Sequence, residues 1–338
     1  MPARRRPWES RGTAAADGLH SAQRTAHVAP GNQAGSGPLA SAEPFSSLYW
    51  IARVLTDAPL DGPVIVAFGD SITRGDGTTI DSEQRYPDHL QARLLAAGID
   101  GAAVLNAGLG ANRLLRPQVG PPMTGRLARD VLSIVEATHV IIMGGLNDIG
   151  LPAVLGGPRP AAAQLIDALF HLARRASEHG IQPVLGTLTP IRASRYDSFL
   201  ADGNEDIRQA VNHAIMTQRD WPTADFSAAL ADPDDPSRIA AAFDSGDGVH
   251  PADTGAYALA DAINLTAFSQ DRPHRRLRYY YAYLGKQRRF RCPTGVPHQA
   301  PPPGSPVRRL GGSAWLGRGR SRRWRWRGAR SGRWRRRG

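Results

Sequence analysis

Cysteine is nearly absent from this chain of 338 residues, in which Cys292 stands alone. A single cysteine excludes an intramolecular disulfide, a zinc site built from several cysteines and a Cys-x-x-Cys redox pair. Long apolar runs are absent too, because no stretch reaches the roughly 18 apolar residues that a membrane-spanning helix needs. Arg4-Arg5-Arg6 is followed by Ala, Gly, Ser and Pro rather than by an apolar stretch. We therefore expect no signal peptide and no membrane span, and the compartment stays open.

Lysine is equally scarce, since Lys286 is the only one, and acidic residues stop at Asp271. Residues 272–338 hold 21 Lys and Arg and no Asp or Glu, whereas residues 63–270 hold 15 Arg and 24 Asp and Glu, a formal balance of −9. The formal net charge of +12 thus comes from the last fifth of the chain. The basic pI is therefore no evidence that the acidic part binds nucleic acid.

Composition divides the chain into four parts. Residues 1–45 are rich in Ala, Gly, Ser and Pro without a helical or strand period, so we expect disorder there. Residues 46–62 form a short lead-in, and residues 63–270 are long enough for one catalytic domain with a buried core. Residues 271–338, rich in Arg, Gly, Pro and Trp, are expected to form a disordered basic tail.

The basic tail has two interpretations. Arginine interleaved with tryptophan could bind nucleic acid or an anionic membrane surface by charge and stacking. A GC-rich coding sequence read past its stop, or out of frame, would give the same mixture of residues. We favour the second interpretation and treat nucleic acid as an unlikely partner.

Short apolar runs alternate with segments of helical period between residues 63 and 270. The expected strands are Val64–Phe68, Ala103–Leu105, His139–Met143, Ile181–Leu185 and Thr223–Phe226. The expected helices are Pro87–Ala97, Leu127–Val135, Ala161–Glu178, Glu205–Met216 and Asp253–Phe268. Such alternation predicts an α/β fold: a three-layer α/β/α sandwich around a mainly parallel five-stranded sheet.

Chemically active side chains follow three of the expected strands and precede the last helix. The segments are Gly69-Asp70-Ser71, Asn106–Arg113, Gly145–Asp148 and Asp247–His250. Ligands of open α/β sheets bind outside the carboxyl ends of the strands. We therefore expect these four segments to meet along one edge of the sheet.

The residue types in these segments match the needs of ester hydrolysis. Ser71 is a weak nucleophile until a base takes its proton, and histidine, here His250, suits that task at neutral pH. Asp247, three residues before His250, is close enough to orient the imidazole ring. Backbone N–H groups of the strand-end turns and the Asn147 amide are candidate donors to an oxyanion. No HExxH motif, acidic metal cluster or P-loop is present, so we expect no metal and no cofactor.

Taken together, the four segments resemble the conserved blocks of the SGNH (GDSL-type) hydrolases, over about residues 63–268. The resemblance implies a flavodoxin-like fold and a serine esterase or lipase that acts through an acyl-enzyme. The triad would be Ser71, His250 and Asp247, and the oxyanion hole would consist of the N–H groups of Ser71 and Ala111 with Asn147. The supporting residues would be Asp70, Gly108, Asn112 and Asp148. The sequence around Asn147 is similar to that of actinobacterial members of the family, which are often secreted.

Ala111 departs from the pattern of the family it resembles, which has an oxyanion-hole glycine at that position. An alanine N–H serves equally well if its φ is allowed, but a positive φ would cost roughly 1 kcal/mol of strain. The alternative to an esterase is therefore a catalytically impaired binding protein on the same fold. Nucleic-acid binding by the tail is a weaker alternative.

The substrate is expected to be a small-molecule, carbohydrate or lipid ester. The sequence leaves its acyl and alcohol groups open, and the oligomeric state as well. Residues 192–202 follow the fourth strand and are expected to line the site, with Tyr196 or Phe199 near the substrate.

Overall fold

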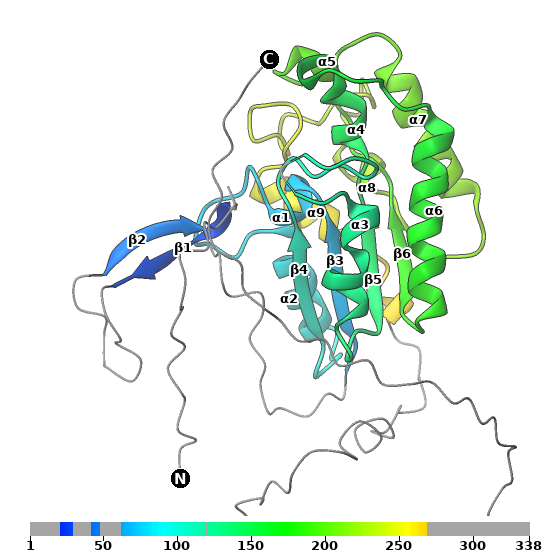
Figure 1. Ribbon diagram of the computed structural model, residues 1–338. Helices are drawn as coiled ribbons and strands as arrows, with labels where there is room; N and C mark the ends of the chain where they lie inside the picture. The colour runs from blue at the N-terminus through cyan, green and yellow to red at the C-terminus, as the bar shows by residue number, and fades with distance from the viewer. Residues whose placement is uncertain (1–20, 30–41, 48–61, 119, 269–338) are drawn as a thin grey trace, which may run out of the picture. The chain divides into compact units, whose positions relative to one another are not determined.

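The computed structural model describes residues 21–29, 42–47, 62–118 and 120–268 (Figure 1). The basic tail with Cys292, and residues 48–61 of the lead-in, lie outside these ranges. Within them, no helix has the length and apolar character to cross a membrane.

A five-stranded parallel sheet forms the centre of the domain. Its strands are β3 (Val64–Gly69), β4 (Ala103–Gly108), β5 (His139–Met143), β6 (Gln182–Gly186) and β7 (Thr223–Ala224). They lie in the order β4-β3-β5-β6-β7 and every neighbouring pair is parallel, as predicted. The chain moves from β3 to β4 on one side and then to β5 on the other. Such a reversal leaves a crevice at the carboxyl ends of β3 and β5, where α/β proteins place their ligands.

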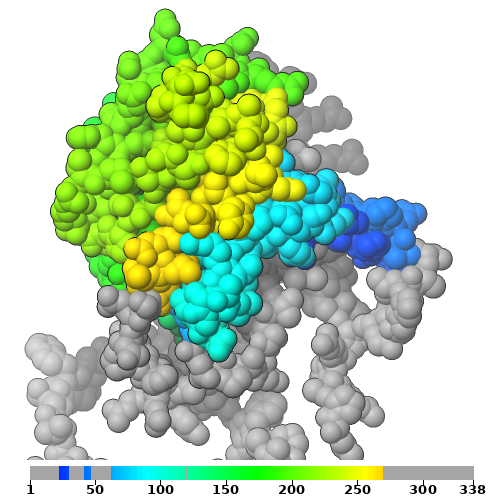
Figure 2. All heavy atoms as spheres, turned by 180° about the vertical axis from the view of Figure 1, so that it is seen from behind, coloured from blue at the N-terminus to red at the C-terminus, as the bar shows by residue number. Residues whose placement is uncertain are grey.

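Helices cover both faces of the sheet, which gives the predicted three layers. Helices α3 (Met123–Leu127), α6 (Ala162–Glu178) and α7 (Asn204–Thr217) cover one face. On the other face are α2 (Tyr86–Ala96), α8 (Phe226–Leu230) and α9 (Asp253–Asp261). Figure 1 shows α3 and α6 in front of the strands with α2 and α9 behind them. Seen from behind in Figure 2, the cyan and yellow segments that include α2 and α9 lie side by side.

Apolar strands and amphipathic helices account for this packing. Every residue of β3 and β5 is buried, as expected for parallel strands with helices on both faces. Helix α6 buries Leu165, Leu169 and Leu172, which recur at helical spacing on one side. Full burial of each such leucine contributes roughly 2 kcal/mol. The core is therefore continuous from the sheet into both helical layers.

Several elements differ from the predicted boundaries. Helix α3 begins at Met123 and continues as a π-helical turn, Ala128–Leu132, instead of one helix over 127–135. Strand β7 stops at Ala224, because Asp225 caps α8. The closing helix ends at Asp261 and is followed by a separate 3-10 turn, Leu265–Phe268. Short helices that carry no long apolar period were not predicted: α1 (Ser71–Arg74), α4 (Leu146–Gly150), α5 (Pro152–Leu155) and the 3-10 turn Asp197–Phe199.

The expectation of disorder throughout residues 1–45 is wrong for Ser21–Val28. These residues form β1, which pairs antiparallel with β2 (Glu43–Ser47). Thr25 donates from its N–H and its hydroxyl to the Asp81 carboxylate, in the segment between α1 and α2. The pairing joins segments separated by some 15 residues and lacks a marked apolar alternation, so a local period could not indicate it.

Candidate active site

Ser71 lies at the point where the central strand β3 gives way to helix α1. Asp70 caps this helix, because its Oδ1 accepts a hydrogen bond of 3.0 Å from the Ile72 N–H. At the other end, Asn106 at the edge of the sheet donates from Nδ2 to the Thr73 carbonyl at 2.8 Å. The short helix is thus held at both ends, and Ser71 is 7% exposed.

Gly108 allows the second strand-end turn to approach the first closely. A Cβ built on Gly108 would lie 2.1 Å from the Arg74 backbone nitrogen, a distance that no side chain tolerates. Only glycine fits where the end of β4 packs directly against the end of α1. The structure therefore places Gly108 in the support of the Ser71 helix.

Ser71, His250 and Asp247 form a continuous hydrogen-bonded chain. The Ser71 Oγ and the His250 Nε2 are 2.8 Å apart, although 179 positions separate them in the sequence. The His250 Nδ1 lies 2.6 Å from the Asp247 Oδ2. The other oxygen of Asp247 accepts from the backbone N–H groups of Val249 and His250, at 2.9 and 2.8 Å. With both oxygens of Asp247 engaged, the carboxylate and the imidazole ring are held in one orientation.

The loop that carries Asp247 and His250 is tightly fixed. Gly248 has a φ of +70°, and a Cβ there would lie 1.9 Å from the Ala193 carbonyl oxygen. The Gly248 N–H donates to Asp244 at 2.9 Å, and the Asp247 carbonyl accepts from the Arg195 N–H at 2.8 Å. The position of the His250 ring therefore depends on the neighbouring segment 193–195 as well as on its own loop.

The pKa values of the pair move in opposite directions. Burial alone would lower the pKa of His250, but the hydrogen bond and charge of Asp247, with the charges of Asp76 and Asp70, raise it above the ordinary value. Burial alone would raise the pKa of Asp247, but hydrogen bonds from the side chain and backbone of His250 hold it well below its usual range. An ionised Asp247 beside an imidazole of raised basicity is the arrangement that a general base requires.

Three candidate oxyanion donors lie at the ends of the neighbouring strands. No hydrogen bond within the described ranges uses the backbone N–H of Ser71 or of Ala111. Asn147, 8% exposed and in the first turn of α4 after β5, donates from Nδ2 to the Asn112 carbonyl at 3.0 Å. An amide carries two N–H groups, so this bond orients the Asn147 side chain and leaves its second N–H for a ligand.

Ala111 has a φ of +52°, in the left-handed region. This conformation is strained by about 1 kcal/mol for alanine, whereas glycine adopts it without strain. Turn bonds hold the strained conformation in place, since the Asn112 N–H donates to the Leu109 carbonyl at 3.1 Å.

The supporting carboxylates are buried and bonded to backbone. Burial raises the pKa of Asp70 to about 6, although the Ile72 N–H and the charge of His250 oppose the change. Asp148 is fully buried and accepts from the backbone N–H groups of Leu114 and Leu115, beyond Ala111 in the same loop. Burial also raises the pKa of Asp148. Asp148 thus connects the loops that follow β4 and β5, whereas Asp70 caps the helix that begins at Ser71.

Residues 67–258 match the GDSL-like lipase/acylhydrolase family, which is more than half of the chain. The chain belongs to this family. It is also 32% identical, over 132 residues, to the uncharacterized lipoprotein YqeF of Bacillus subtilis (strain 168), a match that covers 38% of this chain and 49% of that protein. The chain thus spans about half the length of this curated relative.

Solved structures similar to the GDSL-like chain include a lipase/acylhydrolase from Enterococcus faecalis. It is 22% identical, with 59% of this chain and 92% of that chain covered and a TM-score of 0.46. A carbohydrate acetylesterase family member from Sinorhizobium meliloti is 19% identical, with 59% and 94% covered and a TM-score of 0.46.

Two aromatic residues in the loop 192–202 of the GDSL-like domain, Tyr196 and Phe199, differ in their exposure. The Tyr196 hydroxyl lies 3.5 Å from the Asp247 Oδ2 and the ring is half exposed, so Tyr196 borders the site. Phe199 is buried against Gly150, where an added Cβ would lie 2.6 Å from its ring. Of the two, only Tyr196 is accessible to a bound molecule.

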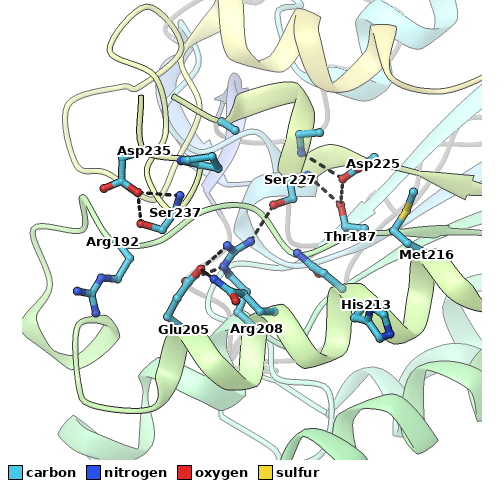
Figure 3. A pocket seen from close by; sticks show the side chains of 15 residues that line it. Thr187, Arg192, Glu205, Arg208, His213, Met216, Asp225, Ser227, Asp235 and Ser237 are labelled. Atoms are coloured by element: carbon cyan, nitrogen blue, oxygen red, sulfur yellow. Dashed lines mark hydrogen bonds and ion pairs between the residues drawn. The ribbon is translucent and has the colours of Figure 1, made fainter. Parts of the chain in front are cut away.

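A hollow of about 750 Å³ lies at the carboxyl ends of β6 and β7 (Figure 3). Arg208 on its wall is bonded to Glu205 and Ser227, while Asp225 accepts from Thr187. These charged and polar groups bond to one another, and none of the residues that line the hollow is a candidate catalytic, oxyanion-hole or supporting residue. No group of three or more metal-ligating side chains is found in the described part of the chain.

Arg126 is the residue near Ser71 that the sequence analysis missed. It lies in α3, and its guanidinium donates to the carbonyl groups of Gly69, the last residue of β3, and of Ala107, near the end of β4. Arg126 directly precedes the helix expected over residues 127–135, close to Arg129 and Asp130, and an arginine in such a stretch predicts a surface residue.

Proposed function

We propose that this GDSL-like protein is a serine hydrolase of carboxylic esters that works through an acyl-enzyme. The observation that carries the proposal is the 2.8 Å contact between the Ser71 Oγ and the His250 Nε2, continued at 2.6 Å to Asp247. A hydroxyl, an imidazole and a carboxylate in this order form the arrangement that activates the serine of triad hydrolases at neutral pH.

In the proposed reaction, the Ser71 oxygen attacks the ester carbonyl carbon while His250 accepts the hydroxyl proton. The tetrahedral intermediate collapses, His250 passes that proton to the departing alcohol, and the acyl group stays on Ser71. A water molecule then attacks the acyl-enzyme, with His250 again as base, and the acid leaves as Ser71 regains its proton. Asp247 keeps the His250 ring in place and stabilises the imidazolium in both halves.

Oxyanion stabilisation is assigned to the N–H groups of Ser71 and Ala111 and to the Asn147 amide. Their support is geometric: the three donors come from the ends of β3, β4 and β5, and the bond from Asn147 to the Asn112 carbonyl keeps two of the contributing segments together. Removal of one such donor typically costs about 10²–10³ in kcat.

Hydrolysis of a short p-nitrophenyl ester tests the proposal. Ser71→Ala should abolish turnover, whereas Ser133→Ala, which removes an exposed serine, should leave it unchanged. Retained turnover in Ser71→Ala would refute the assignment of the nucleophile. Asn147→Ala should lower kcat by about 10²–10³, and a loss below tenfold would remove Asn147 from the oxyanion hole.

The competing hypothesis is a binding protein disabled by Ala111, and the φ of +52° is the observation in its favour. A fluorophosphonate separates the two, because it labels an activated serine and leaves an inactive scaffold unlabelled. The substrate is proposed to be a small-molecule, carbohydrate or lipid ester. A series of acyl chain lengths, run beside acetylated xylan, would distinguish among these classes.

A further inference from the structure

Arg126 is an almost fully buried cation, 2% exposed, at the ends of the two strands that lead to the proposed oxyanion hole. Its Nη2 donates to the Gly69 carbonyl at 2.6 Å, and its Nη1 donates to the Ala107 carbonyl at 2.9 Å. Gly69 is two residues before Ser71, and Ala107 is four residues before Ala111. One guanidinium therefore joins the carboxyl ends of β3 and β4, and the turns that follow these strands supply the backbone donors.

A third bond connects Arg126 to the remaining donor. The Arg126 Nε donates at 2.8 Å to the side-chain oxygen of Asn112, whose Nδ2 donates to the Pro121 carbonyl at 2.9 Å. The backbone carbonyl of the same Asn112 accepts the bond from Asn147. Both ends of the Asn112 side chain are thus engaged, and the carbonyl that orients the Asn147 amide is held in place.

A carboxylate and an aromatic ring compensate the charge of Arg126. Asp130, one helical turn later, accepts from Nη1 at 2.8 Å, and the Phe68 ring lies 4.2 Å from the guanidinium carbon. A planar guanidinium has five N–H groups in a rigid fork, so it reaches several fixed acceptors at once. Neither lysine, with its single ammonium, nor a neutral side chain of this size has that geometry.

We propose that Arg126 is a positioning residue that holds the three oxyanion donors of Ser71, Ala111 and Asn147 in register. The inference rests on the proposed function. Arg126 acts through Gly69, Ala107 and Asn112, and its role is distinct from that of the donors. Because the donors matter most when charge develops on the substrate oxygen, loss of Arg126 should lower kcat and leave KM nearly unchanged.

Arg208, labelled in Figure 3, provides a matched control, because it too is a buried arginine, 3% exposed. It is bonded to Glu205, to Ser227 and to the Leu188 carbonyl, away from β3 and β4. Arg208→Met should therefore remove a comparable number of buried bonds without moving the oxyanion donors.

The experiment measures kcat and KM on a short p-nitrophenyl ester, with each variant assayed well below its own Tm. Arg126→Met should lower kcat on the order of 10²-fold, since displacements near 1 Å in a catalytic site have that effect. Its KM should stay within about threefold of the wild type. Arg208→Met should keep kcat within about threefold while losing a similar amount of thermal stability.

Arg126→Lys tests the fork directly, and it is the fallback if Arg126→Met does not fold. It retains the charge but not the geometry, so kcat should still fall about tenfold; full activity would show that charge alone suffices and would overturn the proposal. The double variant Arg126→Met/Asn147→Ala should lose less than the product of the two single losses, because both act on the same oxyanion hole. Multiplicative losses would also overturn it.

The outcomes separate the two proposals. A wild-type protein that neither hydrolyses the ester nor reacts with a fluorophosphonate refutes the proposed function, and the role of Arg126 with it. A reactive wild type in which Arg126→Met keeps kcat within threefold, or in which Arg208→Met loses as much, refutes only the role of Arg126.

Discussion

Asp70 is a carboxyl group that the fold removes from water almost completely, 2% exposed, beside the proposed nucleophile. Burial raises its pKa to about 6, against an ordinary value of 3.8. Asparagine at this position would keep an oxygen to accept from the Ile72 N–H and would carry no charge. Asp70→Asn therefore isolates the free-energy cost of burying an ionised carboxylate.

The expected magnitude follows from the difference between the two pKa values. A change from 3.8 to about 6 corresponds to about 3 kcal/mol of folding free energy. Because the folded-state pKa of Asp70 lies above the unfolded one, the neutral form favours folding. That stabilisation is fully present below about pH 4 and is lost as the pH rises through about 6. At pH 8, Asp70→Asn should be more stable than the wild type by up to about 3 kcal/mol.

Urea unfolding at intervals from pH 4 to pH 8 measures this difference. The two proteins should be nearly equally stable at pH 4 and should diverge between pH 4 and pH 6, with unchanged m-values. Asp247→Asn is the control of opposite sign: the pKa of Asp247 is held low, so its charge stabilises the fold at pH 8 and this variant should be less stable there. A pH-independent difference, or an Asp70→Asn protein less stable than the wild type at pH 8, would refute the reasoning.

Three further predictions concern the same loops. Ala111→Gly should raise the free energy of unfolding by about 0.5–1 kcal/mol in urea titrations, because it relieves the strain at φ +52°; a loss of stability would contradict this. In the pH dependence of kcat/KM, the midpoint of the acidic limb should lie above pH 6.5, the ordinary pKa of histidine, because the pKa of His250 is raised. Asp76→Asn should move this midpoint to lower pH, and an unchanged midpoint would show that the charge of Asp76 does not raise the pKa of His250. Gly248→Ala should destabilise the protein by more than about 2 kcal/mol in thermal unfolding, because its Cβ meets the Ala193 carbonyl. The control Gly246→Ala, at φ +100° with open space around it, should cost only about 1 kcal/mol.

Local patterns were sufficient to predict the layers and the main chemical groups. The apolar runs of β3 and β5 and the leucine spacing of α6 are periodic over a single element, and periodicity can be read within one segment. The candidate site followed from one topological rule, because parallel strands place their carboxyl ends at one edge. Ser71, Asn147 and His250 were predicted to meet there, and the structure brings Ser71 and His250 to 2.8 Å.

Features that depend on distant contacts could not be predicted in the same way. The short helices α1 and α4 have no room for a period, and the pairing of β1 with β2 joins segments that lack one. Phe199 is buried against Gly150 whereas Tyr196 is half exposed, and this difference in exposure depends on a contact between distant segments. These features arise from packing between elements, which a single segment does not encode.

The amino-acid sequence by itself determined the parallel sheet, the edge where polar groups gather and the kinds of side chain available for chemistry there. Tertiary structure alone decided that Ala111 adopts φ +52° and that a buried Arg126 reaches Gly69, Ala107 and Asn112. The physical reason is that hydrophobic period and turn chemistry act over a few residues. The conformation of a strained turn and the partners of a buried cation are set by groups that meet only after the chain has folded.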